Sequence, residues 1–220
     1  MAAPDAAPTL PAITVESTVL ILLAAGRSRR FGDIGSKLTE PFLGRPLGLH
    51  VAVALQGMPF LERLAIVDGA RLDYAPYGFT PVHNDDPGEG MSRSVRLGVA
   101  RARELGAAAV LVALADMPRV TATHIHRMFD AVDGPAAVVA SSDGTAPKPP
   151  ALFGRDRFDA LLALTGEDGA RAMVAAGRHV VTTPAELIDV DTAEELDQLR
   201  ALVHDPAAHT IIHAEARRSD

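Results

Sequence analysis

The feature that most constrains the fold is a continuous apolar run over residues 19–25 that stops abruptly at Gly26. Unbroken apolar runs of this length are typical of strands buried on both faces of a parallel sheet. The segment that follows combines glycines with fixed cations, namely Gly26, Arg27, Arg29, Arg30, Gly32 and Lys37. Because glycine lets a backbone turn tightly and bring its N–H groups close to an anion, the pattern predicts a strand that delivers a basic loop suited to a polyphosphate.

Two common phosphate-binding loops do not fit this segment. A dinucleotide-binding loop requires G-x-G-x-x-G, and a P-loop requires G-x-x-x-x-G-K-[ST]. Here five residues separate Gly26 from Gly32, and no glycine directly precedes Lys37. The sequence therefore argues against a dehydrogenase and a P-loop NTPase. A solvated loop with incidental arginines is the alternative to a ligand site.

Composition limits the classes of function. At 220 residues the chain is long enough for one well-packed domain, which would bury about 70% of the surface of its unfolded chain. A net charge of -7 argues against nucleic acid as the partner, because binding a polyanion relies on a basic surface. The chain has no cysteine, which excludes a thiolate nucleophile and cysteine-ligated zinc. The apolar runs are about half the length needed to span a bilayer, so we expect no membrane association and a cytoplasmic protein.

The remaining patterns alternate between strands and helices. Short apolar runs predict strands over 64–67, 80–83, 107–115, 136–142 and 180–182, and helical spacing predicts helices over 46–55, 92–105 and 122–132. Such alternation is typical of an α/β fold with a mostly parallel sheet and helices on both faces. We expect a mobile N-terminal extension over 1–14, one domain over 15–203 and a C-terminal tail over 204–220.

Polar residues at the ends of these elements are candidates for a site. Ser92 is positioned as a helix N-cap, and a helix N-terminus of this kind can bind an anion, although an ordinary cap is the alternative. Asp116 follows the apolar run over 107–115, where open α/β sheets bind ligands, so it is a candidate magnesium ligand or else a turn aspartate. Near the end of the chain, Asp191 with Glu194, or Thr192 with Glu195, has the spacing of a capping box.

Six motifs in this order resemble the MobA-like NTP transferase family, and within it the molybdenum cofactor cytidylyltransferases. The first is L-A-A-G-R-S-R-R-F-G over 23–32 with the following K-L at 37–38. The others are G-M-S-R-S over 90–94, L-A-D-M-P over 114–118, P-A-L-F over 150–153, L-T-G-E-D-G-A-R over 164–171 and D-V-D-T-A-E-E-L over 189–196. The resemblance implies a single Rossmann-like nucleotidyltransferase domain. Its expected reaction moves CMP from CTP to the phosphate of molybdenum cofactor and releases pyrophosphate.

The resemblance also implies roles for residues. It implies Arg30, Lys37 and Asp116 as catalytic residues, and Mg²⁺ held by Asp116 and Asp191, with Asp189 in reserve. Its nucleotide-binding residues would be Leu23, Ala24, Ala25, Gly26, Arg27, Ser28, Gly32, Lys37, Gly90, Ser92 and Ser94. Its acceptor side would contain Pro150, Leu152 and Arg171. In this family the form Leu-Ala-Ala-Gly is associated with CTP, and the client is a molybdenum hydroxylase.

One motif departs from the family pattern and keeps two alternatives open. Lys148 and Pro149 stand where relatives have Gly-His or Gly-Arg ahead of the proline. The acceptor could then be a sugar phosphate or an alcohol phosphate. A second alternative is a protein that carries the pterin cofactor to molybdenum hydroxylases without catalysing transfer.

Overall fold

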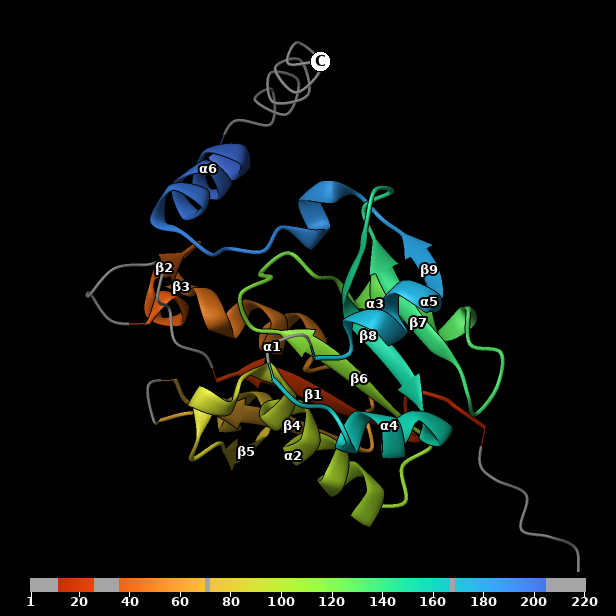
Figure 1. Cartoon of the computed structure of the whole chain (residues 1–220). Helices are drawn as coiled ribbons and strands as arrows, with labels where there is room; N and C mark the ends of the chain where they lie inside the picture. The colour runs from red at the N-terminus through yellow and green to blue at the C-terminus, as the bar shows by residue number, and fades with distance from the viewer. Residues whose placement is uncertain (1–11, 26–35, 70–71, 167–168, 205–220) are drawn as a thin grey trace, which may run out of the picture.

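A computed structural model of the chain describes residues 12–25, 36–69, 72–166 and 169–204. A seven-stranded sheet with the order β5-β4-β1-β6-β8-β7-β9 runs through the middle, and helices pack on both of its faces (Figure 1). Neighbouring strands are parallel except where β8 pairs with β6 and β7, and these two pairings are antiparallel. The expected α/β class with a mostly parallel sheet is confirmed.

The strands, in chain order, are β1 Thr18–Ala24, β2 Pro41–Phe42, β3 Arg45–Pro46, β4 Glu62–Val67, β5 Thr80–His83, β6 Ala109–Leu114, β7 Val138–Ser142, β8 Pro147–Gly154 and β9 Arg178–Val181. The α-helices are α1 His50–Leu55, α2 Met91–Glu104, α3 Ala122–Asp130, α4 Phe158–Leu162, α5 Arg171–Ala176 and α6 Ala193–His204. The 3-10 turns are η1 Lys37–Thr39, η2 Leu47–Leu49, η3 Ala75–Tyr77, η4 Pro87–Glu89, η5 Arg155–Arg157 and η6 Pro184–Leu187.

Strand β1 lies inside the sheet and is buried on both faces. Leu20 and Leu22 pack in the cluster that contains residues of α1 and α3, whereas Val19, Ile21 and Leu23 pack with residues of α2 and α4. Fully burying one such side chain stabilises a fold by about 1.5–3 kcal/mol. The strand is continuously apolar because alternate side chains enter two different cores.

Parallel pairing brings the carboxyl ends of three strands to one edge of the sheet. Leu23 near the end of β1 is in register with Ile66 of β4 and with Leu114 of β6. The segments that follow these strands therefore emerge side by side. This edge is where ligands bind in open α/β sheets.

The expectation for residues 147–154 was incomplete, because this segment is a strand of the central sheet. The sequence suggested only an acceptor segment, since its three prolines argue against an interior strand. β8 pairs with β6 only from Ala151 to Gly154, while Pro147 and Lys148 pair with β7 alone beyond a register shift in β7. Prolines are accepted here because the β6 ladder has already ended.

The expected helix over 46–55 begins later than its sequence suggests. Pro46 belongs to β3, a 3-10 turn follows, and the α-helix starts at His50. Leu47, Val51 and Leu55 are nevertheless fully buried, as their spacing predicted. The short β2–β3 hairpin and α6 share a small core of their own at one end of the molecule (Figure 1). Within the described part of the chain, the helices are too short or too polar to cross a membrane.

Candidate active site

Asp116 stands at the sheet edge described above, two residues beyond the end of β6. The backbone N–H of Val190 donates a hydrogen bond of 3.1 Å to the carbonyl oxygen of Asp116. Val190 is fully buried against Phe42, Leu47 and α6. This single tie brings both neighbours of Val190, Asp189 and Asp191, to Asp116.

The three aspartates form an acidic cluster. Asp116, Asp189 and Asp191 each offer a carboxylate oxygen, and these oxygens lie within 4.8 Å of one another. Asp116 and Asp191 are partly buried and Asp189 is exposed. Two segments more than 70 positions apart in the sequence therefore build one site, as the expected metal ligands require.

Lys37 is the first residue of η1, which follows the basic loop in the sequence, and its side chain joins the cluster. Its Nζ lies 2.7 Å from Oδ2 of Asp116 and 2.7 Å from Oδ1 of Asp191. Burial alone would lower the pKa of Lys37, but the charges and hydrogen bonds of Asp116 and Asp191 outweigh it and raise that pKa. The lysine thus stays charged and takes a position between two carboxylates that favours a cation.

The chemistry of the cluster suits a divalent cation. Oδ1 of Asp116 is buried and has no hydrogen-bond partner among the described residues. A buried carboxylate oxygen is costly unless something cationic or a donor meets it. Mg²⁺ and Mn²⁺ prefer oxygen ligands, carboxylates above all. The residues present therefore fit a hard divalent ion held by Asp116, Asp189 and Asp191.

The three negative charges also act on one another. Although the side chain of Asp189 is exposed, the protein around it removes enough water, together with the charges of Asp116 and Asp191, to raise the pKa of Asp189 to about 7. Lys37 opposes this rise. A cation at the cluster would need Asp189 ionised, so metal binding should release a proton near neutral pH.

This raised pKa predicts how stability depends on pH in metal-free protein. The folded protein holds the proton of Asp189 up to about pH 7, whereas the unfolded chain loses it near pH 4, so ionisation opposes folding increasingly between these values. We expect Asp189→Asn to raise the thermal midpoint above that of wild type at pH 8. The difference should disappear as the pH falls towards 4. Thermal unfolding in EDTA across this range measures it, and a constant difference would contradict the prediction.

Asp191 directly precedes the cap of α6, and one of the two expected capping boxes is present. Thr192 Oγ1 accepts a hydrogen bond from the N–H of Glu195, and the Glu195 carboxylate accepts from the N–H groups of Thr192 and Asp191. The cap thus uses Thr192 and Glu195 rather than Asp191 and Glu194. The cap does not use the Asp191 carboxylate, which pairs with Lys37 in the acidic cluster.

The expectation that Ser92 is the N-cap of helix α2 was wrong. The N-cap is Gly90, whose φ of 90° favours glycine. Ser92 is fully buried and its hydroxyl donates to the carbonyl oxygen of Gly166 at 2.6 Å. Ser94 is buried too, and its hydroxyl accepts from Nδ2 of Asn84 at 3.0 Å. Both hydroxyls hold protein partners, and contact of Gly90, Ser92 and Ser94 with a nucleotide stays a prediction.

Other candidate nucleotide-binding residues lie at the end of β1 or beyond it. Leu23 and Ala24 end the strand, Ala25 follows it, and Ala24 and Ala25 are partly exposed at the carboxyl edge. The remaining candidates lie outside the described residues, namely Gly26, Arg27, Ser28, Arg30 and Gly32. Their roles stay predictions from the motif.

The three candidate acceptor residues do not come together as one surface. Leu152 is fully buried in the core. The buried Pro150 presents its carbonyl oxygen to the hydroxyl of Ser141 at 2.9 Å. Arg171 is exposed at the first position of α5. An acceptor role for these residues stays a prediction.

Asn84 was not singled out as a side chain in the sequence. It follows β5 and is buried, and its Oδ1 accepts hydrogen bonds from Nε of Arg93 and the N–H of Asp86. It therefore connects the end of β5 to the first turns of α2. The polar run Asn84-Asp85-Asp86 directly after a strand was the available signal.

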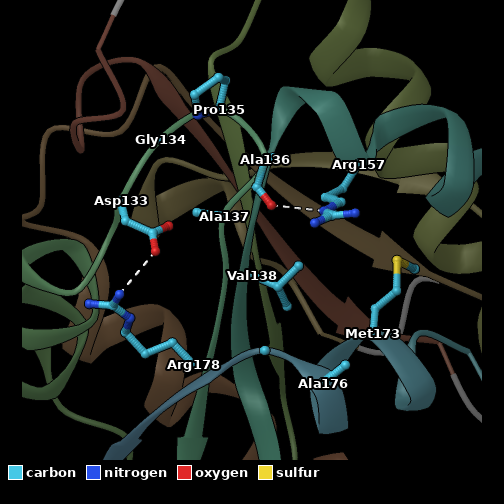
Figure 2. A pocket seen from close by; sticks show the side chains of 11 residues that line it. Asp133, Gly134, Pro135, Ala136, Ala137, Val138, Arg157, Met173, Ala176 and Arg178 are labelled. Carbon is cyan, nitrogen blue, oxygen red and sulfur yellow. Dashed lines mark hydrogen bonds and ion pairs between the residues drawn. The ribbon is translucent and has the colours of Figure 1, made fainter.

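A hollow of about 450 Å³ lies away from the acidic cluster, at the amino ends of β7 and β9 (Figure 2). Arg178 pairs there with Asp133 at 2.9 Å, and Nε of Arg157 donates to the carbonyl oxygen of Ala136. Because β7 runs in the same direction as β6, this hollow is at the opposite edge of the sheet from Asp116. The hollow contains none of the candidate site residues.

Comparison with known proteins bears on this site. The model of the MobA-like NTP transferase domain matches residues 20–182. The chain is 31% identical over 199 residues to the purine catabolism protein PucB of Bacillus subtilis, covering 82% of this chain and 94% of that protein. It is 29% identical over 204 residues to the phosphoenolpyruvate guanylyltransferase of Conexibacter woesei, covering 86% and 84% of the two chains.

Solved structures show the same fold. Rv0371c of Mycobacterium tuberculosis H37Rv superposes with a TM-score of 0.67 at 26% identity, covering 86% of this chain and all of that one. A structure of Rv0371c in complex with manganese superposes with a TM-score of 0.62 at 24% identity, covering 84% and 98% of the two chains.

Proposed function

The chain belongs to the MobA-like NTP transferase family, a family of nucleotidyltransferases, and we propose that it transfers CMP from CTP to the phosphate of molybdenum cofactor and releases pyrophosphate. The observation that carries this proposal is the meeting of Lys37, Asp116, Asp189 and Asp191 at the carboxyl edge of the sheet. Four charged groups from three segments converge there, next to the end of β1 from which the arginine-rich loop departs.

The reaction joins two anions. An oxygen of the acceptor phosphate bonds to the α-phosphorus of CTP, and the bond from that phosphorus to the oxygen bridging to the β-phosphorus breaks. A divalent cation held by the three aspartates would neutralise charge on the phosphate oxygens of both reactants. Mg²⁺ is the ion we propose, and the manganese complex of Rv0371c supports a divalent metal.

The chain's own groups contribute charge and position. Lys37 is kept protonated by Asp116 and Asp191, so its ammonium is available to the triphosphate and to the departing pyrophosphate. Asp116 is fixed by the β6 strand before it and by the Val190 hydrogen bond to its backbone. Holding reactants and charges in a fixed arrangement supplies much of the rate enhancement in phosphoryl transfer. The reaction requires no nucleophilic side chain.

Two observations support the choice of substrates. The Leu-Ala-Ala-Gly form at residues 23–26 is the form that resembles the CTP-dependent members. The similarity to a protein named for purine catabolism supports a molybdenum hydroxylase of purine metabolism as the client that would use the product. CTP and molybdenum cofactor are therefore the pair we propose.

A second pair is favoured by another relative. The 29% identity to a phosphoenolpyruvate guanylyltransferase supports GTP with a small phosphorylated acceptor. Lys148 and Pro149, which depart from the cytidylyltransferase pattern on the acceptor side, agree with this alternative. The site chemistry is the same for both pairs.

Pyrophosphate release separates the two pairs. The full chain is incubated with Mg²⁺ and each of CTP, GTP, ATP and UTP, alone and with molybdenum cofactor, phosphoenolpyruvate or a sugar phosphate. Release with CTP only when molybdenum cofactor is present supports our proposal. Release with GTP only when phosphoenolpyruvate is present supports the second pair of substrates instead. Binding of the cofactor without release from any nucleotide, by folded protein, would support a carrier.

A further inference from the structure

Two buried polar atoms near the acidic cluster lack hydrogen-bond partners among the described residues. One is Oδ1 of Asp116, an acceptor, and the other is the hydroxyl of Tyr74, which is a donor. Tyr74 is only 3% exposed. Most buried polar side chains are hydrogen-bonded. A carboxylate oxygen has two lone pairs, so Oδ1 can meet a cation and still accept one hydrogen bond, for which the Tyr74 hydroxyl is a candidate donor.

The hydroxyl of Tyr74 reaches the turn that carries Lys37. A Cβ built on Gly48 would lie 3.0 Å from this hydroxyl and 2.9 Å from Cβ of Leu38, the residue after Lys37. The ring packs in the same core as Ala115 and Met117, the two neighbours of Asp116. Tyr74 therefore lies beside the turn that begins at Lys37, and the charge of Asp116 acts on its phenol.

The charge state of the phenol agrees with a donor role. Burial raises the pKa of Tyr74, and the negative charge of Asp116 raises it further. The hydroxyl therefore keeps its proton at neutral pH. It would be stabilised by donating a hydrogen bond to a negatively charged group. Gly48, which is buried, leaves the space that the hydroxyl needs, because any larger residue would contact it.

We propose that Tyr74 is a positioning residue of the metal site, whose hydroxyl donates through one buried water molecule to Oδ1 of Asp116 and fixes the carboxylate for a divalent cation. Buried waters typically bond to polar groups that would otherwise be unsatisfied. Groups that orient a ligating side chain typically change metal affinity by about 10- to 100-fold when removed. The inference rests on the metal site of the proposed function, but not on the nucleotide or the acceptor.

The chain offers a matched pair of variants, because Tyr74 and Tyr77 are its only two tyrosines. Tyr77 is the last residue of η3, the 3-10 turn that follows Tyr74, and is partly exposed. Mn²⁺ affinity of the full chain is measured by the paramagnetic resonance of free Mn²⁺, without nucleotide. We expect Tyr74→Phe to weaken Mn²⁺ binding by about 10-fold or more, and Tyr77→Phe to leave it unchanged.

A Tyr74 hydroxyl that is buried but makes no hydrogen bond predicts a different result. Removing an unsatisfied buried polar group stabilises a fold, so Tyr74→Phe would then raise the thermal midpoint in EDTA and leave Mn²⁺ affinity at the wild-type value. That combination overturns the proposal. So does wild-type protein that binds no Mn²⁺.

A spectroscopic test does not depend on the folding of Tyr74→Phe. The chain has no tryptophan, so Tyr77→Phe leaves Tyr74 as the only fluorescent side chain of its kind. We expect Mg²⁺ to change this tyrosine emission with a saturating curve, and the added substitution Asp116→Asn to abolish the change. Emission that does not respond to Mg²⁺, in protein shown to bind it, contradicts the proposal.

These results are independent of substrate identity. If no nucleotide and acceptor pair releases pyrophosphate while Tyr74→Phe weakens Mn²⁺ binding, the proposed function fails and the role of Tyr74 stands. If CTP and molybdenum cofactor react while Tyr74→Phe binds Mn²⁺ like wild type, the function stands and the role of Tyr74 fails.

Discussion

Asp116→Asn is expected to lower turnover by on the order of 10² to 10³ or more while the protein remains folded. The substitution keeps the size of the side chain and removes the charge that pairs with Lys37 and that a divalent cation would need at the end of β6. Turnover with CTP and acceptor, Mn²⁺ affinity and circular dichroism measure the effect. We expect Mn²⁺ affinity to fall together with turnover.

The matched control for this variant is Asp133→Asn. Asp133 is also ion-paired, to Arg178 at 2.9 Å, but it lies at the opposite edge of the sheet. Its loss removes the same charge from the protein and should leave turnover near wild type. Wild-type turnover in Asp116→Asn would remove Asp116 from the reaction.

Lys37→Ala is expected to lower turnover by a similar factor, on the order of 10² to 10³. Unlike Asp116→Asn, this substitution should not lower the affinity for Mn²⁺. The ammonium lies between Asp116 and Asp191, where it repels a divalent cation, so its removal should leave Mn²⁺ affinity unchanged or higher. If both variants lose turnover equally but only Asp116→Asn lowers Mn²⁺ affinity, Lys37 acts as a phosphate-binding group and Asp116 as a metal ligand.

The control is Arg178→Ala, at the opposite edge of the sheet from Lys37. Arg178 is ion-paired to Asp133 at 2.9 Å, so this variant also removes a cation that is paired with a carboxylate. Turnover at saturating CTP and acceptor should stay near wild type in this variant. Lys37→Arg should recover part of the lost rate because it restores the charge. A Lys37→Ala protein with lower Mn²⁺ affinity would instead indicate that the lysine supports the aspartates structurally.

Local patterns in the sequence predicted much of the sheet. The runs over 64–67, 80–83, 107–115 and 136–142 all overlap strands. The strands at 64–67 and 109–114 are almost wholly buried between two helical layers, where a strand must be apolar at nearly every position. Element ends were less accurate. The helix expected over 46–55 begins at His50, and the 147–154 segment is an antiparallel strand despite its prolines. Whether a proline-rich segment joins a sheet depends on which neighbours continue beside it, and no local pattern encodes that.

The site was predictable in its residue types and only partly in its arrangement. The motif indicated that Lys37, Asp116, Asp189 and Asp191 belong to one site. It did not indicate that Lys37 bonds both Asp116 and Asp191, nor that Val190 ties the last segment to Asp116. Ser92 shows the reverse case. The sequence predicted Ser92 as a helix N-cap, yet its buried hydroxyl bonds to Gly166, 74 positions away.

The sequence by itself determined the α/β class, the strand that ends at the basic loop, and the acidic residues placed at strand ends, because these follow from apolar periodicity and from motif spacing. The tertiary structure alone decided which charges share one cluster, which cap begins α2 and where the buried hydroxyl of Tyr74 points. Those features depend on contacts between segments far apart in the chain, whose free energy is set by packing and desolvation in three dimensions rather than by neighbouring residues.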